Sequence, residues 1–407
     1  MSFQGVIQNK LKGGLAQEGT SERAIVLVCG MSAIPDKIQL NKPIKLTDVN
    51  VLSALGVTEE SDLARKELAA YHVAEMFRLA PESSFYLLPV SKTEKISTLS
   101  VKPEFLSALK SIDSVAVVGF ASLAADTSVS VAVQAAQVMV NMLASEFIYL
   151  DAVLVEGLGT YLEDTVSEYA DLRELEADTV SVIIAQDPGK ASQDAAYASH
   201  AAIGATLGMI AVRDVHENVG SVDIEVKPRT KKSQADYPLT DKLSGRFLTA
   251  GLSNGTLISS VSAADQTKLS NLGYIYAGSF AGYPGVFLSN SCTCCEADSD
   301  YAYIERNSIW NKAARIIRET MIPRIRSKVE ADPATGYVKS TTISDWDGRI
   351  RKALEPMVAS GNIADFDIYI NPKQIAVSKK PFQIQVKLVA DGVVHEFEVD
   401  LGFTNKI

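Results

Sequence analysis

Hydrophobic positions in the first half of the chain follow two alternating patterns. A continuous apolar run, typical of a strand buried on both faces, occupies residues 24–29, and further strands are expected at 85–90, 115–120, 147–155 and 179–185. Helical spacing or helix-forming composition occurs at residues 61–80, 128–145, 163–175 and 191–207, with a short strand expected at 209–212. Strands that alternate with helices in this way predict βαβ units and a largely parallel sheet. We therefore expect residues 23–225 to form a layered α/β sandwich, the outer domain.

The rhythm changes after this domain. The polar segment 226–242 contains two prolines, and we interpret residues 226–267 as a boundary region. Residues 268–380 are expected to form a C-terminal domain of helices and strands. Its expected elements are short strands at 274–280 and 286–289, helices at 307–329 (kinked at Pro323) and 346–359, and a strand at 366–370.

The clearest alternation lies at the end of the chain. Apolar residues alternate with polar ones twice, on either side of the turn signal Asp391-Gly392, at Phe382, Ile384, Val386 and Leu388 and then at Phe397, Val399 and Leu401. This pattern predicts a half-buried antiparallel hairpin within residues 381–407. The fold class is accordingly a combination of α/β and α+β, with a terminal β-hairpin.

Both chain ends raise the question of strand exchange. Residues 1–22 are weakly patterned, with Phe3, Val6 and Ile7 as the main apolar positions, and fit either a mobile arm or an extended arm that pairs with another chain. A terminal hairpin leaves edges of unpaired N–H and C=O groups. Such an edge is either blunted by charges such as Lys387 or filled by a strand from a neighbouring subunit, for which the N-terminal arm is a suitable donor.

Composition narrows the possible functions. The chain has 407 residues, 47% of them hydrophobic, and a formal net charge of -10, which disfavours binding to nucleic acid. No apolar run approaches the roughly 18 residues of a membrane span, and the start of the chain lacks the apolar core of a secretory signal. With four cysteines in so long a chain, we expect a protein made in a reducing cytoplasm and not inserted into a membrane.

Charge is distributed unevenly along the chain. The acids between Asp151 and Asp187 are opposed only by Arg173, whereas the long helix near the C-terminus is basic. One interpretation is that both are solvated faces of an acidic protein. The other is that they are complementary surfaces, which would fix partner choice and register more than affinity.

Candidate chemistry is sparse. Gly157-Leu-Gly159 lacks the third glycine of a dinucleotide fingerprint, and the four histidines are scattered. Cys292, Cys294 and Cys295 are too closely spaced to supply more than three metal ligands, so we interpret them as structural thiols. We expect no cofactor, no metal and no enzymatic activity, with an α/β enzyme sited near 157–160 as the alternative.

Several segments of the second half resemble the C-terminal domain of contractile tail sheath proteins of phages and phage-tail-like injection particles. They are residues 300–309 (DYAYIERNSI), Trp346-Asp347 and 361–372 (GNIADFDIYINP), and residues 208–214 (GMIAVRD) are similar to the segment by which that family returns from its outer domain. One departure is Val286–Asn290, where the family often has a Trp-Gly-Ala-Arg-Thr-like strand.

The resemblance implies a structural role. Sheath subunits form six-fold rings stacked helically around an inner tail tube, held together by arms that add strands to neighbouring subunits, and they work with baseplate and tail terminator proteins. Contraction then drives the tube through a target envelope. The resemblance implies assembly in the bacterial cytoplasm and a mature place in a virion tail or phage-tail-like particle. Another self-assembling, tail-associated structural protein is the alternative.

The basic helix is the expected contact with the tube, because sheath proteins attach to their tube largely through charge. The tube-facing candidates are Lys312, Arg315, Arg318, Arg324, Arg326 and Lys328. The candidates for strands shared between subunits are Phe3, Val6, Ile7, Phe382, Ile384, Val386, Leu388, Phe397, Val399 and Leu401.

Overall fold

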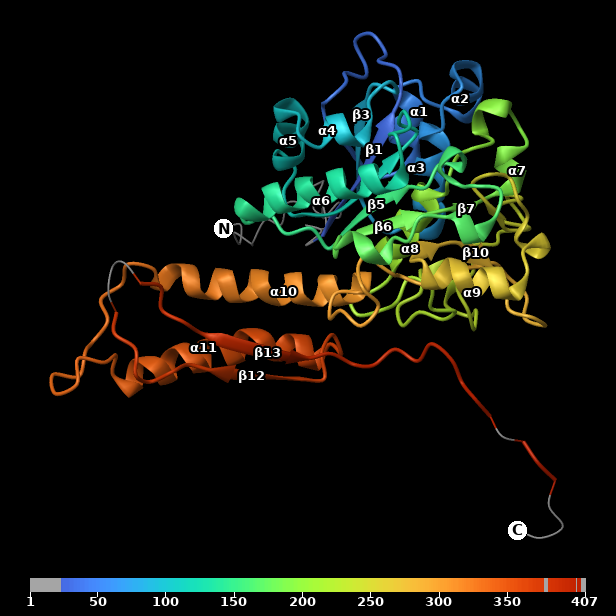
Figure 1. Ribbon diagram of the computed structural model, residues 1–407. Coiled ribbons are helices and arrows are strands. Elements are labelled where there is room, and N and C mark those ends of the chain that lie inside the picture. Colours follow the sequence, from blue (N-terminus) through green and yellow to red (C-terminus); the bar gives the residue numbers. More distant parts are fainter. Residues whose placement is uncertain (1–22, 377–379, 400, 404–407) are drawn as a thin grey trace, which may run out of the picture.

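The computed structural model describes residues 23–376, 380–399 and 401–403. A large α/β unit lies above a smaller layer that contains the last two long helices and the last two strands (Figure 1). The expected N-terminal arm, with Phe3, Val6 and Ile7, lies outside the described residues.

A seven-stranded sheet with the order β2-β3-β1-β4-β5-β6-β9 forms the centre of the large unit. Only β2 at one edge is antiparallel to its neighbour, so the expected parallel sheet is confirmed. The strands are β1 (Ala24–Gly30), β2 (Ile44–Leu46), β3 (Phe85–Val90), β4 (Val115–Ala121), β5 (Ala152–Glu156), β6 (Val180–Ile183) and β9 (Tyr274–Ile275). Strand β9 lies in the region that we assigned to the C-terminal domain.

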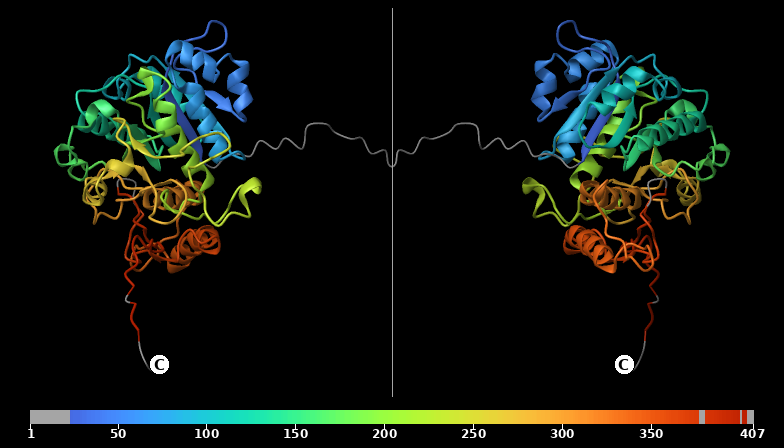
Figure 2. Two further views of the ribbon diagram at one scale, coloured as in Figure 1. Left: turned by 90° about the vertical axis from the view of Figure 1, so that its right-hand side faces the viewer. Right: turned by 90° about the vertical axis from the view of Figure 1, so that its left-hand side faces the viewer.

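Helices cover both faces of this sheet, which confirms the layered sandwich (Figure 2). Alternate residues of β1 point to opposite faces, Leu27 to one core and Val28 to the other. The Leu27 face packs against α1 (Val49–Ala54), α3 (Ala69–Leu79) and α8 (Ile203–Val212). The Val28 face packs against α4 (Ile96–Leu99), α5 (Pro103–Lys110), α6 (Val129–Ser145) and α9 (Ala263–Asn271).

The helix expected at 163–175 is wrong. Two short 3-10 turns stand there instead, η2 (Val166–Glu168) and η3 (Arg173–Leu175). The Asp171 side chain accepts a hydrogen bond from the backbone N of Arg173 at 2.9 Å. Such local side-chain bonds offer the backbone an alternative to the helix, and the acid-rich segment becomes a loop.

The helix expected at 191–207 and the strand at 209–212 are also wrong. Asp187 and Asp194 cap two short turns, α7 (Pro188–Ala191) and η4 (Ala195–Tyr197), and the long helix α8 begins only at Ile203. The apolar run at 209–212 is therefore the end of a buried helix. Periodicity alone does not separate a buried helix from a buried strand in a short apolar run.

Smaller elements complete the large unit. A two-stranded pair joins β7 (Ala185–Gln186) to β8 (Gly251–Leu252), and another joins β10 (Ala277–Gly278) to β11 (Phe287–Leu288). The remaining short helices are α2 (Glu59–Arg65), η1 (Gly159–Tyr161), η5 (Arg229–Lys231) and η6 (Ile258–Ser260).

The lower layer contains α10 (Ile304–Met321), η7 (Ile322–Arg324), α11 (Ser340–Ala359), β12 (Asp365–Tyr369) and β13 (Gln385–Val389). Both expected long helices are present. However, α10 ends at Met321 and does not continue through a kink at Pro323, because proline cannot donate the next helical hydrogen bond.

The chain does end in an antiparallel pair, but its strands are not those expected. Strand β13 pairs with β12, from Asp365 opposite Val389 to Tyr369 opposite Gln385. Residues 393–399, the expected partner across the Asp391-Gly392 turn, have no strand structure. The inward residues of β12, such as Ile368, complete the hydrophobic core under α11. A hairpin formed only from residues 381–407 would lack this contribution from β12.

One buried carboxyl group gives the large unit a pH-dependent stability. Glu156, at the end of β5, accepts hydrogen bonds from the backbone N of Ser122 (2.6 Å) and of Ala201 (2.9 Å). Burial raises the pKa of Glu156 to about 7. Burial has the opposite effect on two bases, since it lowers the pKa of His72 to about 3 and that of His200 to about 4.

We expect the stability of Glu156→Gln relative to the wild type to be greater at pH 8 than at pH 5. The folded pKa of Glu156 lies above the unfolded value, so the contribution of Glu156 to the free energy of unfolding falls as pH rises from about 4.5 to about 7, by about 3 kcal/mol in total. His72 and His200 have the opposite effect on the free energy of unfolding below the unfolded pKa of histidine, because burial lowers their folded pKa values. This effect is the same in the wild type and in Glu156→Gln. Urea unfolding at pH 5 and pH 8 measures the difference, and an identical pH dependence in the variant would contradict the assignment to Glu156.

Candidate assembly site

The lower layer has its own hydrophobic core. Helix α10 contributes Ile309 and Ala313, α11 contributes Trp346 and Ile350, and β12 contributes Ile368. The Trp346 ring meets the ring of Phe382 edge to face at a centroid distance of 5.0 Å. This packing holds the β12–β13 sheet against the two helices.

Strand β13 is incomplete on one side. Within the described residues it pairs only with β12, so the backbone N–H and C=O groups of its other edge have no strand partner. Val386 and Leu388 are half-buried toward the helices, whereas Gln385, Lys387 and Val389 are exposed. An unblocked edge with one apolar face is the structure that accepts an added strand.

A groove of about 520 Å³ runs between β13 and α10. Its apolar lining comes from Val386 and Leu388 of β13 and from five residues of α10, Ile309, Trp310, Ala313, Ala314 and Ile317. Arg306, Asp300 and Lys387 supply charged groups to the same groove. A strand added to β13 would bury its inward side chains here.

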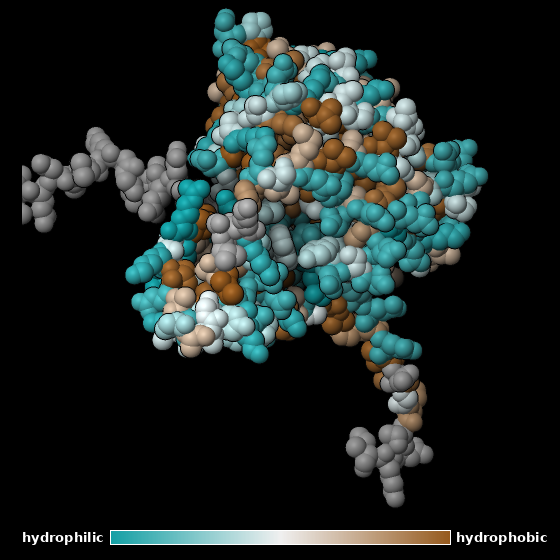
Figure 3. Space-filling model, turned by 60° about the vertical axis from the view of Figure 1, so that its left-hand side comes forward, coloured by the Kyte–Doolittle hydropathy of each residue, from teal (hydrophilic) through white to brown (hydrophobic). Residues whose placement is uncertain are grey.

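The tail of the same chain carries side chains suited to such a groove. Beyond β13 the chain projects away from the body, with hydrophobic residues along the projection (Figure 3). The exposed fractions of Phe397, Val399 and Leu401 are 83%, 78% and 96%. His395 marks the start of this projection, where its ring stacks on Tyr303 at a centroid distance of 5.2 Å.

The strand candidates therefore fall into two groups. Phe382, Ile384, Val386 and Leu388 are half-buried in the subunit's own lower core. Phe397, Val399 and Leu401 contact no core of their own subunit and remain available. Sequence reasoning missed the α10 side of the groove, although Ile309, Ala313 and Ile317 recur at the four-residue spacing of one helix face.

The basic candidates do not form one face. Lys312 donates to Asn362 Oδ1 at 2.7 Å, and Arg315 lines a cavity beneath the large unit. The guanidinium of Arg318 lies 4.0 Å from the centre of the Phe147 ring. Arg324, Arg326 and Lys328 follow the end of α10 at Met321, so they do not continue the helical face on which Lys312 and Arg315 lie.

The other chemical candidates are buried or closed. All four cysteines are free and buried, and burial raises the pKa of Cys292 to about 11. A Cβ atom at position 159 would lie 2.4 Å from Ser253 O, so the backbone of the same chain occupies the space beside the Gly157–Gly159 turn.

Across residues 23–376, 380–399 and 401–403, no three His, Cys, Asp or Glu side chains are grouped as metal ligands. No helix in that same part of the chain is both long and apolar enough to cross a bilayer.

Comparison with known proteins agrees with this architecture. The sequence profile of the DUF2586 N-terminal domain matches residues 3–292, and that of the DUF2586 C-terminal domain matches residues 300–407. A search among curated proteins finds no match.

Solved structures share the fold over nearly the whole chain. A chain of the anti-feeding prophage baseplate, 6-fold symmetrised, aligns with a TM-score of 0.60 and 14% identity over 100% of both chains. A chain of an extracellular contractile injection system, the PVC sheath complex in its contracted state, has a TM-score of 0.60 and 14% identity over 100% of this chain and 98% of the other. The sheath tail protein of Desulfitobacterium hafniense has a TM-score of 0.51 and 9% identity over 95% and 99%. The fold is thus that of contractile tail sheath proteins.

Proposed function

The chain belongs to the DUF2586 family, and from this premise we propose that it is the structural subunit of a contractile tail sheath. One observation carries the proposal. The same chain has an open β-strand edge above an apolar groove and an exposed tail whose apolar residues alternate at strand spacing. Each feature is incomplete in a single subunit, and a second copy supplies what each lacks.

In the proposed contact, the tail of one subunit lies in the groove of the next. Phe397, Val399 and Leu401 would face α10, and the tail backbone would pair with β13. Glu396 and Glu398 would then alternate on the other side of the added strand. Residues 396–407 can span about 40 Å when extended, which is enough to leave one subunit and cross a neighbour's sheet.

The proposed assembly is the one that the sequence resemblance implies. Subunits would form six-fold rings stacked helically around an inner tube, between baseplate and terminator proteins, first in the bacterial cytoplasm and finally in a phage tail or a phage-tail-like particle. A heterologous contact such as tail to groove generates rings or helical filaments, which supports this arrangement. The basic residues that follow α10, Arg324, Arg326 and Lys328, would be the part nearest the tube.

Contraction would be a rigid-body movement of whole subunits. The sheet of the large unit is packed against a hydrophobic core on each face, which makes this unit rigid. The tail contacts the rest of its own subunit at few points, such as the stack of His395 on Tyr303. Exchanged tails would therefore act as hinges that keep neighbours joined as the rings rotate and widen.

A substitution that fills the groove tests the proposal. We expect Ala314→Arg to leave the subunit folded and to prevent assembly, because the larger side chain would occupy the space of the incoming strand. Ala359→Arg, at the exposed end of α11, adds the same side chain away from the groove and should assemble normally. Circular dichroism checks the fold and electron microscopy checks for tubes or stacked rings.

A competing peptide gives a second readout that does not depend on the variant. A synthetic peptide of residues 393–407, added in excess before assembly, should cap the grooves and shorten the polymers. The same peptide with serine at 397, 399 and 401 should have no effect. Normal tubes from Ala314→Arg, together with no effect of the wild-type peptide, would exclude the groove as the assembly site.

A further inference from the structure

Two stretches on the surface of the large unit carry no charge. One is the turn after β10, residues 279–284 (SFAGYP), in which every residue is exposed. The other is helix α6, which has no charged residue in its 17 positions and exposes Val131, Val138 and Met142. In a chain with 22% charged residues, exposed apolar and aromatic surface without charge is typical of a protein–protein contact.

The turn presents two aromatic rings. The exposed fractions of Phe280 and Tyr283 are 56% and 40%. Each ring packs on the buried ring of Phe287, at centroid distances of 5.9 Å and 6.1 Å. The hydroxyl of Tyr283 also donates to Asp236 Oδ2 at 2.9 Å. Both rings are therefore held in place before any partner binds, which reduces the entropy lost on binding.

A pocket of about 290 Å³ lies between α6 and α10. Its aromatic lining comes from Tyr149, Tyr301 and Trp310. The Trp310 ring is 42% exposed and meets the Tyr149 ring edge to face at a centroid distance of 5.7 Å. Among the described residues that line the pocket, Asp178 alone is charged, and its Oδ1 already accepts from Gln137 Nε2 at 3.1 Å. An aromatic side chain that enters would find rings to pack against and little charge to desolvate.

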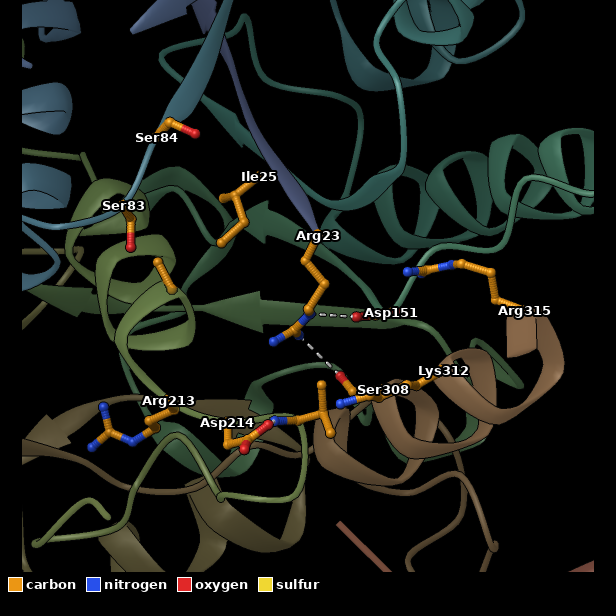
Figure 4. A pocket seen from close by; sticks show the side chains of 12 residues that line it. Arg23, Ile25, Ser83, Ser84, Asp151, Arg213, Asp214, Ser308, Lys312 and Arg315 are labelled. Atoms are coloured by element: carbon orange, nitrogen blue, oxygen red, sulfur yellow. Dashed lines mark hydrogen bonds and ion pairs between the residues drawn. The ribbon is translucent and has the colours of Figure 1, made fainter. Parts of the chain in front are cut away.

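Hydrogen bonds beside this pocket join the large unit to α10. Asn311 Nδ2 donates to the carbonyl oxygen of Leu150 at 2.8 Å and to Asp151 Oδ1 at 3.0 Å. Arg23 donates to Asp151 Oδ2 at 2.7 Å and to Ser308 Oγ at 3.1 Å (Figure 4). The two walls are thus fastened to each other, and the pocket is formed before a partner arrives.

The turn and the pocket lie at opposite ends of the parallel strands. Strands β5, β6 and β9 run in the same direction. Leu150 and Asp178, which line the pocket, come just before β5 and β6, at the amino end of these strands. The turn at 279–284 follows β9 and β10 and so lies beyond the carboxyl end. A subunit therefore cannot fill its pocket with its own turn, whereas a second copy can.

We propose that the aromatic turn of one subunit docks in the pocket between α6 and α10 of a second copy. Phe280 and Tyr283 enter beside Trp310 and Tyr149, and the uncharged face of α6 covers the rest of the turn. Because the contact joins two different surfaces, it links copies head to tail and continues from one copy to the next. It is separate from the tail contact and does not depend on it, since neither α6 nor the turn lines the groove beside β13.

A pair of new cysteines tests this contact in the full-length protein. We expect Asn141→Cys combined with Ala281→Cys to give, under mild oxidation, a ladder of disulfide-linked dimers, trimers and longer chains, because each copy then carries one thiol on each side of the contact. The four native cysteines are buried and do not take part. Asn141→Cys combined with Leu243→Cys, at a fully exposed position outside the turn, is the matched control and should form such chains at least tenfold more slowly.

Removal of the two rings gives a second readout. Phe280→Ser combined with Tyr283→Ser should leave the subunit folded and slow the ladder of the Asn141→Cys/Ala281→Cys protein at least tenfold. Leu243→Ser combined with Leu248→Ser, which removes two exposed apolar side chains elsewhere, should leave the ladder unchanged.

Two results would overturn the contact. One is a ladder no faster than that of the control pair of cysteines, whether or not the protein forms tubes. The other is a ladder that the loss of both rings leaves unchanged. The same ladder in a protein with serine at 397, 399 and 401 would support the contact independently of the tail, so failure of the tail contact and failure of this one are told apart.

Discussion

Replacing the three apolar residues of the tail, Phe397, Val399 and Leu401, with serine abolishes assembly and leaves the subunit folded: this is the expected result with the largest effect. The three side chains are almost fully exposed in the subunit, so its own stability does not depend on them. Buried in a neighbour's groove, each would contribute about 1.5–3 kcal/mol. Their combined loss would weaken every contact in the polymer by several orders of magnitude.

Sedimentation velocity and electron microscopy of the triple variant measure this loss. The matched control is a triple variant on the opposite side of the same tail, with serine at Glu396, Glu398 and Asp400. Because exposed ion pairs contribute little, this control should still assemble, with an altered dependence on salt. Tubes from the apolar variant equal in length and number to those of the wild type would end the strand-exchange mechanism.

The second large effect concerns the packing of α8 on α3. Gly204 faces the backbone of His72 so closely that a Cβ at position 204 would lie 2.3 Å from His72 O and 2.5 Å from His72 Cα. Backbone atoms cannot move aside as a flexible side chain can, so Gly204→Ala must push the two helices apart. We expect the free energy of unfolding to fall by about 3 kcal/mol.

Gly348→Ala is the internal control for this measurement. Gly348 lies in α11 with nothing within 4 Å of an added Cβ, so the substitution should stabilise the protein by about 0.5–1 kcal/mol. Chemical denaturation of both variants gives the comparison. A Gly204→Ala protein as stable as the wild type would mean that α3 and α8 do not approach as closely as described.

The sequence pattern alone predicted an element correctly wherever buried residues recur at a regular interval along the chain. The continuous apolar runs at β1, β3 and β4 could be predicted because a strand covered on both faces has no polar position to accommodate. The alanine-rich helix α6 also lies where its composition placed it, with Ser128 as its N-cap. The resemblance to sheath proteins suggested the proposed function, which these elements alone could not indicate.

Errors arose where a local signal competed with distant partners. Asp391-Gly392 is a strong hairpin signal, but β13 pairs with β12 because that pairing covers the core under α11. The segment at 209–212 is apolar enough for a strand, but Gly204 and Gly208 allow α8 to lie directly on α3. Neither outcome can be read from a window of neighbouring residues.

The sequence by itself determined the element types of the sheet, the alternation of the tail and the uneven charge, because each depends on the order of neighbouring side chains. Only the tertiary structure decided which strand pairs with β13, that α10 and β13 enclose a groove, and that Arg23 and Lys312 line the same cavity. These features join residues far apart in the chain. Their energies come from desolvation and packing between elements, which exist only once the chain has folded.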